Sequence, residues 1–289
     1  MLVMAAFGLY TCQDSDGVVP PNGQISPGKG AVTFFLTDGP CYGSDITGVF
    51  ITVESVEVNG PNGWEIVFAE KKTINLLDYQ NGLSVLLSTI ELDTGHYKGL
   101  RVNLEAAEDG EEKPEHGCFL RFRKNKGVGL CIAKGYRSGL TVKGAFDVKE
   151  GKETSITIDF DARKSIHRFE RFGKYRLRPC VRLIVNYNVG ALQGLYSDVV
   201  QYDRVVVFAY KAGTFTPEEI DESGDNPPFA NASGSSVVDA QGNFRLAFLP
   251  EGTYDLYVAA FTEDGYLLSL ITSKKNLVVV AQESEQVSL

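Results

Sequence analysis

Two aspartates separated by one residue are the first candidates for chemistry in this sequence. Asp159 and Asp161 alternate with apolar residues, so both carboxylates are expected on one face of a strand, opposite its apolar side. Two adjacent carboxylates, with Asp38 as a third, could bind a calcium ion. The alternative is that they form ion pairs with basic residues just downstream. We expect no cofactor other than this candidate calcium ion.

A dense run of basic and aromatic residues follows the aspartates. Arginine presents a fork of donors that suits carboxylate and phosphate groups, and aromatic rings offer stacking faces for sugars. The run predicts a basic face for an acidic polysaccharide or a lipid headgroup, and the net charge of -9 argues against nucleic acid. The alternative is that these side chains neutralise acidic neighbours in the same domain or in a second one. The candidate anion-binding residues are Arg163, Lys164, Arg168, Arg171, Lys174 and Arg176.

Residue types used in catalysis are present, but their spacing does not favour an active site. Asp161, Ser165 and His167 include the types found in a catalytic triad, yet they lie on one short stretch without a nucleophile elbow. A triad requires side chains that converge from different elements. His96 and His116 lack a second ligand at the spacing of a metal-binding helix. We therefore expect a protein that is not an enzyme.

Four cysteines beyond Cys12 allow two disulfide bonds. Cys118 and Cys131 flank a short basic turn and could face each other across a hairpin, which would leave Cys41 to pair with Cys180. The alternative is four buried thiols. No CxxC motif occurs, so neither a structural zinc site nor a redox pair is expected.

The chain around these residues is patterned for β-strands almost throughout. After residue 30, polar and apolar residues alternate in segments bounded by Gly, Asn or Asp, which is typical of antiparallel strands. The segment 75–87, rich in leucine, is the best candidate for a helix or an irregular crossover. No long amphipathic helix competes, so the predicted fold class is all-β.

Length and turn signals divide the chain into two domains. A stretch with two glycines and no charge, residues 186–194, is the predicted boundary. We expect two tandem antiparallel β-sandwich domains, immunoglobulin-like or prealbumin-like, at residues 30–186 and 190–289. Residues 1–12 read as the remnant of a signal, and residues 13–29 as a flexible tether. Charge is segregated too, because residues 113–182 hold 18 Lys and Arg against 7 Asp and Glu.

Six separated segments resemble a known bacterial family. They are LTDGP at 36–40, VESVEV at 53–58, NLLD with NG at 75–82, GLTV at 139–142, IDFDA with KSI at 158–166, and YRLRP at 175–179. In this order they resemble the bacterial domain of unknown function 4382 over about residues 30–186. The resemblance implies a β-sandwich and an envelope location, and it carries no assigned activity.

A second resemblance lies near the C-terminus. The segments VDAQGNFRL at 238–246 and LPEGTYDL at 249–256 are similar to the repeat of transthyretin-like, carboxypeptidase-regulatory and collagen-adhesin B-type modules. Gly242 suits a hairpin turn, and Phe244 and Leu246 suit a core face. The resemblance implies a second β-sandwich and says little about function.

The N-terminal segment contains a candidate lipid anchor. An apolar run ends in LYTC at 9–12, which resembles the bacterial lipoprotein box with Cys12 as its acylated residue. An acyl chain on Cys12 would hold the protein on a membrane. The acidic residues that follow resemble the export tag of surface lipoproteins. Together these features predict an outer-membrane lipoprotein of the cell envelope, exposed at the cell surface.

Three functions follow from these observations. The leading hypothesis is a non-enzymatic, lipid-anchored envelope protein used for binding, adhesion or display at the cell surface. The first alternative is a module that binds carbohydrate or an anionic polymer through the basic face. The second is a structural or fimbria-like subunit whose exposed strand edge pairs with a partner. The expected partners are therefore the membrane, through the N-terminal lipid, and a polysaccharide or a protein at the cell surface.

Overall fold

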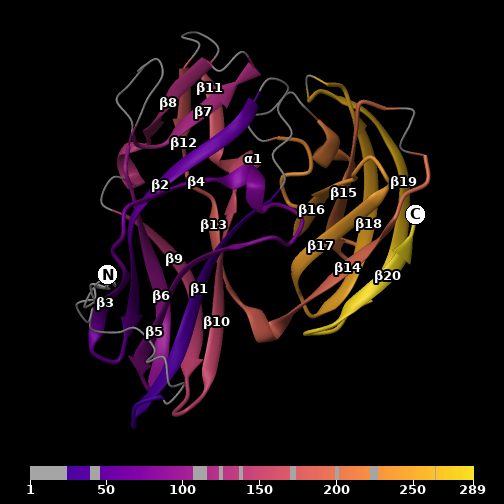
Figure 1. Ribbon diagram of the computed structural model, residues 1–289. Coiled ribbons are helices and arrows are strands. Elements are labelled where there is room, and N and C mark those ends of the chain that lie inside the picture. The colour runs from indigo at the N-terminus through magenta and orange to yellow at the C-terminus, as the bar shows by residue number, and fades with distance from the viewer. Residues whose placement is uncertain are drawn as a thin grey trace, which may run out of the picture.

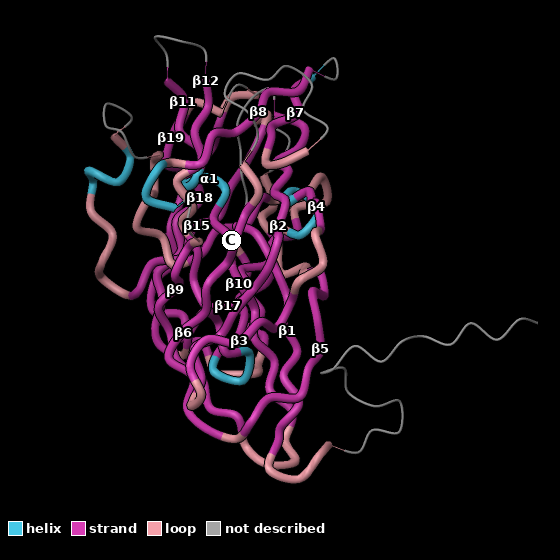
Figure 2. Tube along the Cα trace, turned by 90° about the vertical axis from the view of Figure 1, so that its left-hand side faces the viewer, coloured by secondary structure: helices cyan, strands magenta, loops and turns pink. Residues whose placement is uncertain are grey.

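The computed structural model describes most of the chain as β-strands. It describes residues 25–39, 46–106, 116–123, 126–136, 139–169, 174–198, 202–221, 227–263 and 265–289. In these ranges helical structure is confined to single short turns, which appear as brief cyan segments among long strands in Figure 2. The predicted all-β class is confirmed. None of the helical turns has the length and apolar composition that crossing a membrane requires.

The strands form two sandwiches that lie side by side (Figure 1). We call residues 29–185 the N-terminal sandwich, and its strands are β1 (Lys29–Gly39), β2 (Ile46–Gly60), β3 (Gly63–Phe68), β4 (Lys72–Asn75), β5 (Val85–Asp93), β6 (Gly95–Leu104), β7 (Phe119–Phe122), β8 (Lys126–Ile132), β9 (Leu140–Val148), β10 (Glu153–Asp161), β11 (Ile166–Phe169), β12 (Lys174–Leu177) and β13 (Val181–Val185). We call residues 189–289 the C-terminal sandwich, and its strands are β14 (Val189–Leu195), β15 (Arg204–Lys211), β16 (Gly234–Val237), β17 (Asn243–Pro250), β18 (Gly252–Phe261), β19 (Leu267–Val279) and β20 (Ser284–Ser288).

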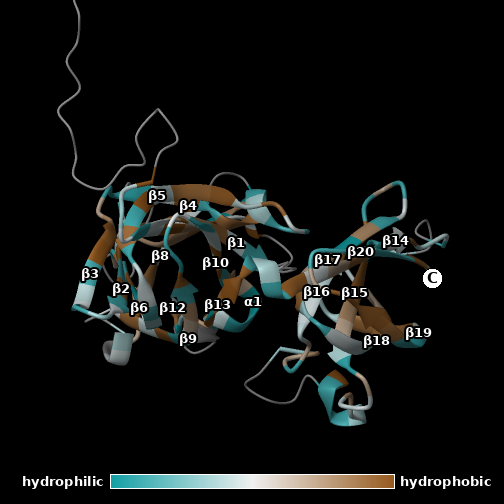
Figure 3. Cartoon of the chain, turned by 90° about the horizontal axis from the view of Figure 1, so that it is seen from below, coloured by the Kyte–Doolittle hydropathy of each residue, from teal (hydrophilic) through white to brown (hydrophobic). Residues whose placement is uncertain are grey.

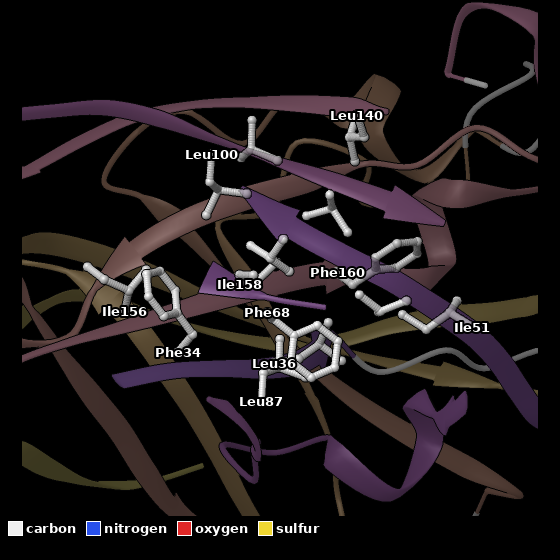
Figure 4. Packing of buried hydrophobic residues seen from close by; sticks show 14 of the residues in the cluster. Phe34, Leu36, Ile51, Phe68, Leu87, Leu100, Leu140, Ile156, Ile158 and Phe160 are labelled. Carbon is white, nitrogen blue, oxygen red and sulfur yellow. The ribbon is translucent and has the colours of Figure 1, made fainter. Parts of the chain in front are cut away.

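The N-terminal sandwich packs a four-stranded sheet on a larger one. The small sheet has the order β13-β10-β1-β5, and the large sheet has the order β11-β12-β8-β7-β2-β6-β9, with β3 and β4 also paired to β2. Alternate residues of β1, among them Phe34 and Leu36, are buried between the sheets. Phe34 meets Phe146 of the opposite sheet at a ring distance of 6.4 Å. Figure 4 shows this apolar core, in which side chains from both sheets interdigitate.

The C-terminal sandwich is smaller and has apolar residues on both faces of one sheet. Its sheets have the orders β17-β14-β20 and β16-β15-β18-β19. One face of β15 and β18 packs between the sheets, and the other face carries an aromatic cluster. In that cluster Phe229 stacks on Phe208 with ring centroids 4.0 Å apart. Phe229 belongs to the segment between β15 and β16, which also forms the helical turn η6 (Pro217–Ile220).

Three strand pairs are parallel, whereas the sequence pattern predicted antiparallel sandwiches. Among the described strands, these parallel pairs are β1 with β10, β8 with β12, and β14 with β20. Alternation along one strand reports burial, and it carries no information about the direction of the neighbouring strand. The parallel pairs join strands far apart in the sequence, which turn signals do not reveal.

The structure settles the form of two predicted segments. In the leucine-rich segment 75–87 the irregular crossover is found and not the alternative of a helix, because only the short turn η1 (Leu76–Tyr79) is helical before β5 begins at Val85. Leu76 is fully buried while Leu83 and Leu86 are exposed, so its leucines do not line one helical face. The predicted boundary at 186–194 contains the helical turn η4 (Asn186–Asn188) and then strand β14.

The glycines of β14 explain why this strand resembles a linker in the sequence. A Cβ atom on Gly194 would lie 1.6 Å from the carbonyl oxygen of Val287 in β20, and one on Gly190 would lie 2.1 Å from that of Val280. Glycine therefore marks a close approach of two backbones here rather than a flexible connection.

Candidate functional site

The two sandwiches meet around a polar cleft. A cavity of about 180 Å³ lies between the ends of β1, β10 and β13 on one side and β16 and β17 on the other. In the view of Figure 3, β13 and the helical turn α1 (Ala162–Ser165) face β16 and β17 across this junction. Its polar lining residues are Thr37, Asp38, Asn81, Asp159, Asp161, Arg163, Lys164, Cys180, Arg182, Ser233, Ser235 and Arg245.

The parallel pairing of β1 and β10 brings the acidic residues together. In this register Thr37 lies opposite Asp159, and Gly39 lies opposite Asp161. Because both strands run in the same direction, their C-terminal ends reach the same edge of the sheet. Asp38 is 4% exposed, and its Oδ1 accepts a hydrogen bond of 2.9 Å from the backbone N–H of Ala162 at the start of α1. The acidic positions predicted from sequence therefore do converge.

Residues 79–83 close this end of the N-terminal sandwich. The Thr37 hydroxyl donates to the carbonyl oxygens of Tyr79, at 3.0 Å, and Leu83, at 2.6 Å. The Gln80 side chain donates to Asp38 Oδ2 at 3.3 Å. These contacts hold the Asn81-Gly82 turn against the end of β1, so three of the six segments that resemble the bacterial family meet at the cleft.

The three buried carboxylates differ in how their charge is stabilised. Burial raises the pKa of Asp38 well above its usual value, against hydrogen bonds from Ala162 and Gln80. Burial also raises the pKa of Asp159, although Arg182 opposes this change by an ion pair from its Nε to Asp159 Oδ2. At Asp161 burial is outweighed, because Arg163 and Lys164 lower its pKa below the usual value.

Asp161 is also the N-cap residue of α1, the helical turn whose side chains contact the C-terminal sandwich. Its side chain caps α1 by accepting a hydrogen bond of 3.1 Å from the backbone N–H of Lys164. The same carboxylate forms an ion pair of 3.1 Å with Lys164 Nζ and lies 3.7 Å from Arg163 Nη2. The cap therefore fixes the start of α1, and the position of α1 in turn fixes the positions of Arg163 and Lys164.

Arg163 inserts into the C-terminal sandwich. Its Nη1 donates to the carbonyl oxygens of Pro228, at 2.8 Å, and Phe229, at 2.9 Å. The guanidinium carbon lies 5.6 Å from the centre of the Phe208 ring. Lys164 Nζ lies 3.5 Å from the carbonyl oxygen of Ala232. A buried guanidinium that meets a carboxylate, two carbonyls and an aromatic ring is a strong directional contact.

A second contact between the sandwiches involves Asn81 and Gly82. The Ser236 hydroxyl donates to Asn81 Oδ1 at 3.0 Å, and the Asn81 amide lies 3.5 Å from the carbonyl oxygen of Val237. Asn81 and Gly82 have φ values of 55° and 88°. A Cβ atom on Gly82 would lie 2.8 Å from Cβ of Ala247, so only glycine permits this approach.

The predicted calcium ligands have protein partners instead. Asp161 is paired with Lys164 and Arg163, as the alternative interpretation of the sequence expected. Asp159 is paired with Arg182 of the neighbouring strand β13, a partner that the sequence did not indicate. Within the described ranges, no group of three or more His, Cys, Asp or Glu residues is placed to hold a metal ion. We therefore do not carry the calcium site further.

Of the predicted anion-binding residues, Arg163, Lys164 and Arg176 are described, and these three do not share one face. Arg163 and Lys164 contact the C-terminal sandwich. Arg176 lies on the exposed side of β12, in the hairpin formed by β11 and β12. Arg171 and the side chains of Arg168 and Lys174 lie outside the described part of the structure. The two residues nearest the aspartates thus serve the junction, and an outer basic face stays a prediction for the others.

The predicted disulfide between Cys118 and Cys131 is not formed. Cys118 is a buried thiol, and burial raises its pKa to about 12. Its backbone carbonyl accepts a hydrogen bond from Leu130, so the buried Leu130 is its neighbour on β8, and Cys131 follows on the opposite face of that strand. Cys180 is exposed at the cleft. Its pairing with Cys41 stays a prediction, because Cys41 lies outside the described residues. The same holds for Cys12.

Sequence reasoning missed the wall that the C-terminal sandwich contributes. Ser233 and Ser235 precede and begin β16, and Arg245 projects from β17, yet none of them stood out by spacing. The sequence did contain one signal for the other side of the junction. The Asn81-Gly82 dipeptide lies in a segment of the family pattern and favours a turn, and this turn contacts the C-terminal sandwich.

Replacement of Arg163 should separate the sandwiches. In Arg163→Met the carbonyls of Pro228 and Phe229 lose their donor and Asp161 loses a neutralising charge, so the free energy of unfolding should fall by about 3 kcal/mol. Urea denaturation measures this loss, and small-angle scattering should show a more extended particle. The control Arg178→Met alters an exposed residue and should change stability by less than about 0.5 kcal/mol. Equal stability of the two variants would contradict this role for Arg163.

Asp38 should make stability fall as pH rises. Between its usual and its raised pKa, native Asp38 keeps a proton that the unfolded chain has released, so folding becomes less favourable with increasing pH. One such group contributes a slope of up to about 1.4 kcal/mol per pH unit. Asp38→Asn cannot ionise and should flatten this slope above the usual carboxyl pKa of about 4, leaving the part due to Asp159. The matched control is Asp198→Asn at an exposed site. Parallel slopes for wild type and Asp38→Asn would exclude this explanation.

One comparison with known proteins assigns a family, and none assigns a function. No curated protein sequence matches the chain. Among solved structures, the minor pilin of Streptococcus agalactiae matches with a TM-score of 0.22 and 10% identity, covering 89% of this chain and 94% of that one. The major pilin subunit of Bacillus cereus has a TM-score of 0.22 and 9% identity, covering 90% and 69%. The fimbrial anchor protein of Porphyromonas gingivalis matches with a TM-score of 0.18 and 10% identity, covering 83% of this chain and 82% of that one. At these TM-scores the matches do not assign a function.

The family match is more informative. Residues 29–179 match the family described as Domain of unknown function (DUF4382), which is more than half of the chain and coincides with the strands from β1 to β12. The segments that form the acidic side of the cleft all lie within this match. The chain therefore belongs to the Domain of unknown function (DUF4382) family.

Proposed function

We propose that this chain is a non-enzymatic, lipid-anchored protein of the cell envelope that serves as a binding, adhesion or display module at the cell surface. In this proposal Cys12 carries the lipid, and residues 13–24 form a tether between the membrane and the two sandwiches. The tether expected over residues 13–29 is shorter, because Ser26 and Gly28 already bond Glu91 and Glu150 and β1 begins at Lys29. An outer-membrane location with the body facing outward follows from the acidic residues after Cys12.

The junction at Arg163 is the observation that supports this proposal most. A display protein needs a body that holds its shape at the end of a flexible tether. Arg163 and Asn81 join the sandwiches through directional hydrogen bonds on two sides of the cleft. Domains joined only by a linker would move independently. A stiff pair of sandwiches on a tether is suited to presenting a surface away from a membrane.

The pairing of the buried carboxylates supports a non-enzymatic role. Asp159 and Asp161 are bound by Arg182 and Lys164, and both oxygens of Asp38 accept hydrogen bonds from Ala162 and Gln80. General acid–base chemistry requires a carboxyl group that can reach a substrate proton. In this arrangement the carboxylates act first as structural acceptors.

Lipidation at Cys12 is tested directly by expressing the full chain in a Gram-negative host. We expect mature protein in the membrane fraction with an acyl mass on Cys12, and accumulation of precursor when the lipoprotein signal peptidase is inhibited by globomycin. The control Cys12→Ala should be absent from the membrane fraction, whereas its urea denaturation curve should match that of the wild type. An unmodified wild-type protein in the cytoplasm would refute the anchor.

A second candidate, assembly through a strand edge, is favoured by β19. This 13-residue strand lies at the edge of its sheet and pairs with β18 among the described strands. Leu268 and Leu270 are 53% and 38% exposed near its beginning, whereas Lys274 and Lys275 protect its middle. Long apolar edges invite strand addition, and lysines discourage it. The proposed contact is therefore the first part of β19, paired with a strand of another chain.

Assembly through β19 should appear as concentration-dependent association. We expect purified wild-type protein to sediment as larger species at high concentration in analytical ultracentrifugation. Leu268→Lys and Leu270→Lys should shift it to monomer, because a charge at the edge opposes pairing. Leu86→Lys, at a 50% exposed leucine of the other sandwich, is the matched control and should still associate. A wild type that stays monomeric throughout would eliminate this candidate.

A further inference from the structure

The cleft between the sandwiches contains polar groups that face a cavity, in addition to the contacts that join the sandwiches. We propose that it binds a small hydroxylated carboxylate, such as a sugar acid, either free or at the end of an acidic polysaccharide. This inference rests on the binding role proposed above and gives that role a ligand class. It places the site at the junction rather than on an outer basic face.

The size of the cleft restricts the ligand. Its volume is about 180 Å³. Pockets for drug-sized ligands occupy roughly 300–1,000 Å³, and one water molecule takes about 30 Å³ of liquid. The cleft therefore holds a group equivalent to a few water molecules, which suits one sugar ring or a short organic acid. A folded peptide or several sugar units would not fit within it.

Two arginines from different sandwiches supply the positive side of the cleft. Arg182 of β13 is 39% exposed and forms its ion pair with Asp159 through Nε. Arg245 of β17 is exposed, and its side chain contacts Gln193. An arginine fork binds a carboxylate by two parallel hydrogen bonds. A ligand held by both arginines would span the junction.

The remaining polar groups select for hydroxyl groups and against a second negative charge. The carboxylate of Asp161 lines the cleft and stays ionised, because Arg163 and Lys164 lower its pKa despite burial. An ionised carboxylate accepts hydrogen bonds from hydroxyl groups and repels a dianion such as a phosphate monoester. Ser233 and Ser235 on the opposite wall provide hydroxyl groups of their own.

Backbone strain is concentrated at this junction. Among the described residues, five that are not glycine have positive φ, and Asn81, Phe229 and Phe248 belong to the junction. Phe248 has φ of 55° and lines the cleft as its apolar wall. Such a conformation in a bulky residue costs about 1–3 kcal/mol and persists where surrounding contacts enforce it. Here it shapes the wall of the cleft that β17 contributes, next to Arg245 and Ala247.

The test is calorimetric titration of the full chain carrying Cys12→Ala, so that no lipid is present. The probes are sodium D-galacturonate, D-galactose, inorganic phosphate and polygalacturonate. We expect galacturonate to bind at one site, with galactose at least tenfold weaker because it lacks the carboxylate. Arg245→Gln should weaken galacturonate binding about tenfold or more through loss of a charge-assisted pair. Arg121→Gln, which alters an exposed arginine of β7, is the control and should leave binding unchanged.

The outcomes separate the alternatives. Binding of both monomer and polymer, weakened by Arg245→Gln, supports a site that accepts chain ends, and binding of the monomer alone supports a free sugar acid as the ligand. Polymer binding that Arg245→Gln leaves intact would overturn the proposal in favour of the outer basic residues. Phosphate binding as tight as galacturonate, or no heat from any probe, would also overturn it. Because Cys12 is replaced throughout, failure of the anchor in its own test is a distinct result.

Discussion

The buried guanidinium of Arg163 is the contact on which the arrangement of the two sandwiches depends. A charge removed from water is tolerated only where other groups replace its hydration. Asp161 and Lys164 belong to the same short turn as Arg163, but the carbonyls of Pro228 and Phe229 belong to the other sandwich. The N-terminal sandwich alone would leave this guanidinium without those two acceptors. The orientation of the sandwiches follows from satisfying it.

The same requirement accounts for the acidic end of the N-terminal sandwich. Arg163 is placed by α1, α1 is capped by Asp161, and the N–H of Ala162 is bound by Asp38. Both aspartates reach this point because β1 and β10 run parallel. Burial raises the pKa of Asp38, whereas Arg163 and Lys164 lower the pKa of Asp161 despite burial, so one buried end of a sheet holds two carboxyl groups whose pKa values are shifted in opposite directions. A cleft with mixed polarity is the result.

Local sequence patterns predict the strands better than the site. Alternation identifies β9 and β17 because burial on one face repeats every second residue. It fails at β14, where Gly190 and Gly194 resemble a linker until the path of β20 is known. Asp159, Asp161, Arg163 and Lys164 stood out by residue type. Asp38 joins them only through parallel pairing across more than a hundred residues, and the carbonyl acceptors of Arg163 lie in the other sandwich. The opposite wall, with Arg245, gave no local signal.

The parallel pairing of β14 and β20 has a consequence for how the protein is made. β14 is the first strand of the C-terminal sandwich, and its neighbour β20 is the last, with the other five strands between them. During synthesis or transport the small sheet stays incomplete until residues 284–288 have arrived. Contacts of such long sequence separation form slowly. The C-terminal sandwich therefore closes late, after nearly all of its chain is available.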